Sequence, residues 1–267
     1  MKSLSVSNTL NKIAKDGLIQ RVGLYGAFNI INSGVPFLVL PFLTSLLSPS
    51  EYAYIDLFNT FYLFLTPIVG LSVHTSITRF YYDKDQIDFA IFFTNTLLFT
   101  LLCSSVLLLT YYITSYYIDN FLGFELPSYF FLLCVIYTVL SQIYEVRLAL
   151  WRLQDNILMF GFFRVGKTLF DVSISILLVY GFSLNWQGHI AGLLISIVLF
   201  VALSIPLFLK DNYLSFKFNL IYIKKAISYG LPLIVHLAGG YLLTQSAKVI
   251  IVKHLSKNDL GVYAVAY

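Results

Sequence analysis

Residues 186–209 read WQGHIAGLLISIVLFVALSIPLFL, and no charged side chain interrupts this run. A bilayer core about 30 Å thick requires about 20 mainly apolar residues in one helix, so the run is long enough to cross a membrane. Similar runs recur along the chain, without the strict apolar and polar alternation of outer-membrane strands. We therefore predict an all-α, polytopic membrane bundle with spans at residues 24–47, 53–78, 88–114, 128–148, 157–180, 186–209 and 229–253.

The composition of the whole chain supports this fold class. Hydrophobic residues make up 58% of the 267 residues and charged residues only 11%, whereas soluble domains contain about 25% charged residues. A water-soluble globular domain is therefore excluded. The 17 basic and 13 acidic residues are scattered between apolar runs, so nucleic acid is not an expected partner. Cys103 and Cys134 lie inside apolar runs, and we expect no disulfide, metal site or cofactor.

Lysine and arginine residues gather in alternate loops of this predicted arrangement. The N-terminal arm and the loops after the second, fourth and sixth spans contain them, whereas residues 48–52, 115–127 and 181–185 contain none. Loops rich in Lys and Arg are retained in the cytoplasm. We therefore expect a cytoplasmic N-terminus, with residues 1–23 forming an amphipathic arm at the membrane surface.

A short motif occurs twice at long range. Residues Leu47–Ala53 read LSPSEYA and Leu255–Gly261 read LSKNDLG, and a Tyr-Gly pair precedes each copy, at Tyr25 and at Tyr229. Because six spans separate the copies, both would cross the membrane in the same direction, as in transporters built from two parallel repeats. The alternative is a chance similarity between two helix starts. We predict a six-helix N-terminal lobe at 24–209, a cytoplasmic linker at 210–228 and the start of a truncated second lobe at 229–267.

Three charged residues, Arg164, Lys167 and Asp171, lie within the predicted span at 157–180. Each would cost about 2.5–3.5 kcal/mol at the centre of a span, so they need water or partners. At 100° per residue they share one stripe with Thr168 and Ser175. This stripe indicates a central cavity with a net positive charge that attracts an anionic ligand. Alternatively, Lys167 and Asp171 neutralise each other, and only Arg164 reaches an interface.

Other predicted spans also contain polar residues that could face this cavity. We expect it to be lined by the first, second, fifth and seventh spans. The candidates for lining it or for coupling transport to an ion gradient are Asp171, Asp56, His74, Asn29, Asn32 and His236.

The motif set resembles the O-antigen and polysaccharide flippases of the multidrug/oligosaccharidyl-lipid/polysaccharide exporter superfamily. The resemblance is carried by Tyr25-Gly26, Pro36, Leu40–Thr44, Leu47–Pro49, Arg79–Tyr82, Arg147–Asp155 and Leu260–Tyr263. It implies a two-lobed helical bundle that moves undecaprenyl-diphosphate-linked oligosaccharide across the bacterial inner membrane by alternating access. It also implies that basic cavity residues bind the diphosphate or acidic sugars, and these roles would fall on Arg164, Lys167 and Lys248.

The resemblance also implies the partners, which are the lipid-linked oligosaccharide, membrane lipid and other polysaccharide-assembly membrane proteins. Two further functions compete with this one. A drug/cation antiporter of the same superfamily would favour acidic cavity groups, whereas the fifth span is net basic. A non-transporting fragment is the other alternative. An enzyme is not expected, because the sequence contains no nucleotide-binding glycine loop and no metal-ligand cluster.

Overall fold

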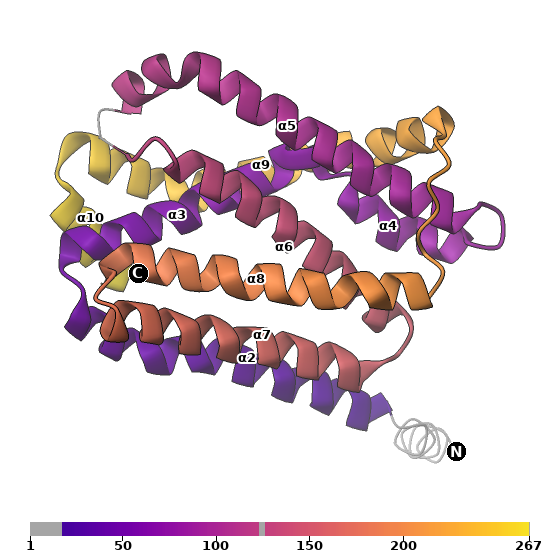
Figure 1. Ribbon diagram of the computed structural model, residues 1–267, viewed down its shortest axis with the longest axis horizontal. Coiled ribbons are helices and arrows are strands. Elements are labelled where there is room, and N and C mark those ends of the chain that lie inside the picture. The colour runs from indigo at the N-terminus through magenta and orange to yellow at the C-terminus, as the bar shows by residue number, and fades with distance from the viewer. Residues whose placement is uncertain (1–17, 123–125, 267) are drawn as a thin grey trace, which may run out of the picture.

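The computed structural model describes residues 18–122 and 126–266, and within these residues the chain is a bundle of helices without β-strands (Figure 1). The predicted amphipathic arm at 1–23 falls largely on residues 1–17, outside the described residues. The longer elements are α2 (Leu18–Leu46), α3 (Pro49–Ile68), α5 (Phe89–Leu122), α6 (Phe130–Leu153), α7 (Ile157–Ile176), α8 (Asn185–Lys210) and α9 (Leu220–His254). The shorter ones are η1 (Val69–Ser72), α4 (His74–Phe80), η2 (Tyr81–Asp83), η3 (Leu177–Gly181) and α10 (Lys257–Ala266).

Six helical segments in the described part of the chain are long and apolar enough to cross a membrane. The prediction of an all-α, polytopic membrane bundle is therefore confirmed. The segment α7 is not among the six, because Arg164, Lys167 and Asp171 all lie within its 20 residues. It nevertheless runs beside α2 and α8 through the length of the bundle (Figure 1).

The helices form a layered arrangement in which helices that are not consecutive along the chain often lie side by side. The helix α2 contacts α7, α7 contacts α8, and α6 packs between α8 and α3 (Figure 1). The helix α9 lies behind α3 and contacts α3, η1, α4 and α5 along its length. Because lipid is as apolar as the helix faces, close packing and polar contacts hold such a bundle together more than apolar burial does.

Aromatic side chains and one glycine show how close this packing is. Phe58 of α3 is fully buried against Phe130 of α6, with ring centroids 6.0 Å apart in an edge-to-face arrangement. At Gly192 of α8, an added Cβ would lie 2.7 Å from the backbone nitrogen of Ser175 in α7. Only glycine permits α7 and α8 to approach this closely.

The second span is broken, whereas the sequence predicts one continuous helix over 53–78. The helix α3 ends at Ile68, and Gly70, Leu71 and Ser72 have positive φ values of 70°, 51° and 55° before α4 begins at His74. Gln142 of α6 compensates the break, since its Nε2 donates to the carbonyl oxygens of Thr66 and Val69 at 2.8 and 3.0 Å. Backbone groups inside a membrane need such partners, and the amide of Gln142 supplies them.

The two copies of the repeated motif begin their helices in the same way. The hydroxyl of Ser48 accepts a hydrogen bond from the backbone N–H of Glu51 at the start of α3. The hydroxyl of Ser256 accepts one from the N–H of Asp259 at the start of α10. Each motif therefore places a serine cap three residues before an acidic side chain. The end of a long helix precedes each cap, α2 in the first copy and α9 in the second.

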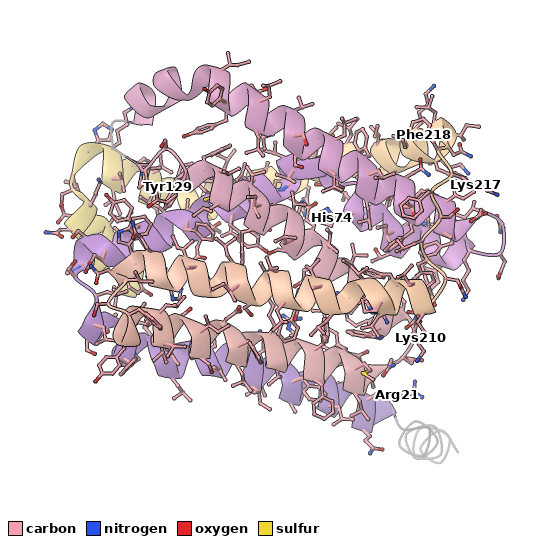
Figure 2. All side chains as sticks on the ribbon, in the orientation of Figure 1. Arg21, His74, Tyr129, Lys210, Lys217 and Phe218 are labelled. Atoms are coloured by element: carbon pink, nitrogen blue, oxygen red, sulfur yellow. The ribbon has the colours of Figure 1, made fainter. Side chains whose placement is uncertain are left out.

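Basic side chains gather at one end of the bundle, as the alternation of Lys and Arg between the loops predicts, although Lys253 and Lys257 lie at the far end of α9. Figure 2 shows Arg21, Lys210 and Lys217 at one end, whereas Tyr129 lies near the opposite end. The segment between α8 and α9 is at the basic end. It is non-helical only over residues 211–219, so residues 220–228 of the predicted linker are the first turns of α9.

Candidate functional site

Two adjoining cavities lie between the helices of the N-terminal part of the bundle. The larger has a volume of about 440 Å³ and is lined by α2, α3, α6, α7 and α8. The smaller has a volume of about 190 Å³ and is lined by α2, α3, α6 and α7. Asn32, Tyr137, Thr168 and Asp171 line both of them. The two cavities therefore adjoin and form one compartment, whose smaller part is mainly polar and whose larger part is mainly apolar.

The charged side chains of the smaller cavity come from one face of α7. This helix begins at Ile157, after Asn156, whose side chain accepts a hydrogen bond from the N–H of Met159 at 3.3 Å. From this start the helical period places Arg164, Lys167 and Asp171 on the wall of the smaller cavity. The structure thus brings together the three charges that the sequence places on a single stripe.

Lys167 is already paired within this wall. Its Nζ lies 2.7 Å from Oδ2 of Asp171, one turn further along α7, and both side chains are mostly buried. The same ammonium group lies 5.8 Å from the ring centre of Tyr137 and 5.7 Å from that of Tyr144. Both interactions stabilise a cation in a medium of low dielectric constant. The pairing that the sequence offers as an alternative to a cationic cavity therefore occurs inside the cavity wall.

Arg164 differs from Lys167 in having no ion pair with another described residue. Its guanidinium lies 5.6 Å from the ring centre of Phe160, and its side chain is half-buried in the wall of the smaller cavity. Glu145 of α6 lines the same cavity. With Glu145 and Asp171 opposing Arg164 and Lys167, the smaller cavity is formally neutral, whereas the stripe of α7 alone is net basic.

A hydrogen bond connects α2 to the stripe of α7. The hydroxyl of Thr168 donates to Oδ1 of Asn32 at 2.6 Å. Asn32, a candidate from the sequence, thus lines both cavities. Asn29 is exposed on α2 and lines neither cavity.

Lys248 and Asp56 form a separate buried pair between α9 and α3. Nζ of Lys248 lies 2.6 Å from Oδ1 of Asp56, and each residue is 8% exposed. One turn away, the hydroxyl of Thr60 lies 3.5 Å from Oε1 of Gln245. These contacts form a polar seam between the two helices.

No residue of α9 lines either of the two cavities, whereas the sequence predicts a cavity bordered by the seventh span. The helices α6 and α8 occupy that position instead. The ammonium of Lys248 instead meets the carboxylate of Asp56, its buried counter-charge on α3. Asp56, Lys248, His74 and His236 therefore lie outside the walls of the two cavities.

Several residues of the compartment were not singled out from the sequence. Tyr62 comes from α3, and Tyr137 and Tyr144 come from α6. His189 of α8 lines the larger cavity, and its Nδ1 is buried without a hydrogen-bond partner among the described residues. A signal for His189 was present, since it is the only ionisable side chain in the run 186–209. Tyrosines gave no such signal in a chain that contains 20 of them.

Comparisons with known proteins agree with this architecture. A family model described as "Polysaccharide biosynthesis protein" matches residues 18–267. "Lsg locus putative protein 1" of Haemophilus influenzae is 24% identical over 263 residues, which are 95% of this chain and 60% of that protein. An "Uncharacterized membrane protein" of the same organism is 24% identical over 262 residues, which are 95% of this chain and 59% of that one.

The fold is also found in a solved transporter structure. A crystal structure of the Vibrio cholerae MATE transporter VcmN matches 96% of this chain and 59% of its own, with a TM-score of 0.60 and 16% identity. The chain thus spans about three-fifths of the length of the curated relatives that it matches. The family model concerns polysaccharide biosynthesis, and the likeness to the solved transporter concerns the fold.

Proposed function

The chain belongs to the polysaccharide biosynthesis protein family, and from this membership we propose that it takes part in moving a lipid-linked oligosaccharide across the bacterial inner membrane. The substrate class would be undecaprenyl-diphosphate-linked oligosaccharide, carried by alternating access between two lobes. The N-terminus would be cytoplasmic, a placement supported by the basic residues at that end of the bundle (Figure 2).

The observation that carries this proposal is a half-buried arginine without an ion pair among the described residues, in the wall of a polar cavity. A diphosphate inside a low-dielectric bundle needs compensating positive charge, and a guanidinium offers two parallel hydrogen bonds to phosphate oxygens. Arg164 would be the first contact of the diphosphate. Lys167 would add a point charge from the adjacent turn of the same helix.

Asp171 decides whether Lys167 is available to the substrate. The carboxylate holds the ammonium at 2.7 Å, so a diphosphate would have to compete with it for Lys167. Any ion or proton that neutralises Asp171 would release Lys167 toward the cavity. We therefore assign to Asp171 the coupling of substrate binding to an ion gradient. Asp56, His74 and His236 lie outside the cavity walls and are weaker candidates for that role.

The larger cavity is suited to a sugar. Its wall offers the amides of Asn32 and Asn59, the phenol of Tyr52 and the imidazole of His189 as hydrogen-bonding groups. Its volume of about 440 Å³ is within the range of about 300–1,000 Å³ that is usual for small-ligand pockets. A cavity of this size would hold only the sugars nearest to the diphosphate.

The test is the removal of both cavity cations. Replacing Arg164 and Lys167 together with Ala in the complete coding sequence should abolish surface polysaccharide in a strain that lacks the native gene. Because Lys167→Ala leaves the buried carboxylate of Asp171 without its partner, Arg164→Ala alone, which breaks no ion pair among the described residues, should also lower surface polysaccharide and should leave membrane abundance unchanged. The matched control is Arg152→Ala, because Arg152 also lies over the Phe160 ring, at 5.5 Å, but does not line either cavity. Normal surface polysaccharide in the double variant would contradict the assignment.

A drug/cation antiporter is the second candidate function. Glu145 and Asp171 in the smaller cavity favour it, because carboxylates bind organic cations. In that case Glu145→Gln should abolish resistance to cationic dyes, while surface polysaccharide should persist in every cavity variant. Loss of polysaccharide without any change in dye resistance favours the flippase.

A further inference from the structure

The segment that joins α8 to α9 exposes aromatic and basic side chains together. Phe216 and Phe218 are 86% and 70% exposed. Four lysines are exposed in the same stretch of chain, Lys210, Lys217, Lys224 and Lys225. We refer to these two phenylalanines and four lysines as the linker surface. Two large apolar rings open to water are unfavourable, so this surface requires a cover.

The linker surface is held in place by side chains of α5. The N–H of Ser215 donates to the hydroxyl of Thr94 at 2.9 Å. The amide of Asn95 donates to the carbonyl oxygen of Lys217 at 2.7 Å and accepts from the N–H of Asn219 at 3.0 Å. Thr94 and Asn95 are buried, so these bonds fix the segment of backbone that carries Phe216 and Phe218.

The position of these anchors sets the depth of the linker surface. Thr94 and Asn95 belong to the second turn of α5, which begins at Phe89 and is one of the candidate membrane spans. The linker therefore lies at the level of the first turns of a spanning helix. Figure 2 shows Lys210, Lys217 and Phe218 at the same end of the bundle as Arg21. This level is the boundary between lipid headgroups and acyl chains, where aromatic rings and lysines are both favourable.

The lysines of the linker surface have no competing acid in their own segment. Asp211 is the only acidic residue between 210 and 225, and its carboxylate lies 2.6 Å from the guanidinium of the buried Arg147. The nearby Asp88 caps α5, where its carboxylate accepts the N–H of Ile91 at 3.1 Å. Both carboxylates therefore have local partners, and the linker surface presents a net positive charge.

We propose that the linker surface binds the anionic phospholipids of the membrane leaflet at this end of the bundle. Phe216 and Phe218 insert between acyl chains, and Lys217, Lys224 and Lys225 contact the phosphate groups. This contact fixes the depth of the linker and of the first turns of α9. Lipid binding of this kind requires no assumption about the transported substrate, so it is tested separately from the proposed function.

Native mass spectrometry of the purified full-length protein tests whether the lysines of the linker surface bind anionic lipid. Phosphatidylglycerol and phosphatidylcholine are titrated separately, and the lipids retained on the protein are measured. The wild type should retain more phosphatidylglycerol than phosphatidylcholine. Replacing Lys224 and Lys225 with Gln should weaken that binding about fivefold for each lysine, with no effect on phosphatidylcholine.

The matched control removes two lysines at the opposite end, Lys253→Gln with Lys257→Gln, and should leave the preference intact. These variants change exposed or partly exposed side chains, and their unfolding temperatures verify that each protein is folded. Equal retention of the two lipids by the wild type would overturn the proposal. So would an effect of the control that equals that of the Lys224 and Lys225 variant.

A photoreactive phenylalanine analogue, p-benzoylphenylalanine, at position 216 tests whether this side chain inserts between lipid acyl chains. In membranes that contain phosphatidylglycerol, light should attach lipid to the protein at this position, and mass spectrometry of the peptide identifies the adduct. Attachment to another segment of the same protein, or to a second protein, would show a different cover and contradict the proposal.

Discussion

Lys248 and Asp56 come from helices that are far apart in the sequence, yet their charged atoms lie 2.6 Å apart. Two buried charges of opposite sign stabilise each other, whereas either one alone in a low-dielectric interior is strongly unfavourable. The pair therefore explains why Lys248 is tolerated inside a predicted span without facing either cavity. It also joins α9 to α3.

Removing one member of this pair should destabilise the protein. Lys248→Ala leaves a buried carboxylate, and we expect a loss of about 3–5 kcal/mol in the free energy of unfolding. Replacing both Asp56 and Lys248 with Ala should recover much of that loss. Unfolding of the purified full-length protein in detergent measures the difference, and a single variant as stable as the double variant would contradict the pairing.

The exposed pair Arg79–Asp83 is the control for this comparison. Its two charged atoms lie 3.1 Å apart on the surface of the bundle, so Arg79→Ala should cost less than about 1 kcal/mol. The Asp56 and Lys248 double variant also distinguishes a structural role of the pair from a role in transport, because stability and surface polysaccharide are measured separately. If it is stable but does not support surface polysaccharide, Asp56 or Lys248 has a role beyond the pair.

The contact between α7 and α8 determines where the charged stripe lies. Gly192 meets the backbone of Ser175, and a hydrogen bond from the hydroxyl of Ser175 to the carbonyl oxygen of His189, at 3.3 Å, joins the same helices. Any side chain at position 192 would push α7 away from α8. Since α7 carries Arg164, Lys167 and Asp171, such a shift would change the cavity wall.

Gly192→Ala should therefore destabilise the bundle by about 1–3 kcal/mol, the usual cost of overpacking. The matched control is Gly166→Ala on α7, because the Cβ there would meet only two ring carbons of Phe200, at 3.4 and 3.6 Å. Thermal unfolding in detergent compares the two variants. Equal stabilities would show that α7 and α8 do not depend on this close approach.

The basic end of the bundle should face the cytoplasm. Lysines and arginines lie at the end that holds Arg21, Lys210 and Lys217 (Figure 2), and such ends are retained on the cytoplasmic side. Ser183, in the turn between α7 and α8, is exposed at the other end of these helices.

Single cysteines at positions 183 and 217, in a chain whose Cys103 and Cys134 are replaced by Ser, should report opposite sides. A membrane-impermeant maleimide should label Ser183→Cys in spheroplasts with an intact inner membrane, and Lys217→Cys only after the membrane is opened. The reverse pattern would invert the proposed topology, and labelling of both in intact spheroplasts would contradict a membrane-embedded bundle.

The sequence determined the all-α membrane class, because a long apolar run is local and needs no knowledge of its neighbours. It also determined which charges share a face of α7, since the helical period alone fixes that stripe. The repeated motif likewise marked the starts of two helices, α3 and α10, at which the structure shows serine caps.

The tertiary structure decided which partners each polar group meets, because those distances depend on packing between helices far apart in sequence. Lys248 forms an ion pair with Asp56 and does not line either cavity. The helices α6 and α8 line the compartment, whereas α9 does not. The tertiary structure also broke the second span at Gly70, where Gln142 of another helix satisfies the freed carbonyl groups. Helical periodicity gives the direction of a side chain, but only packing determines what lies in that direction.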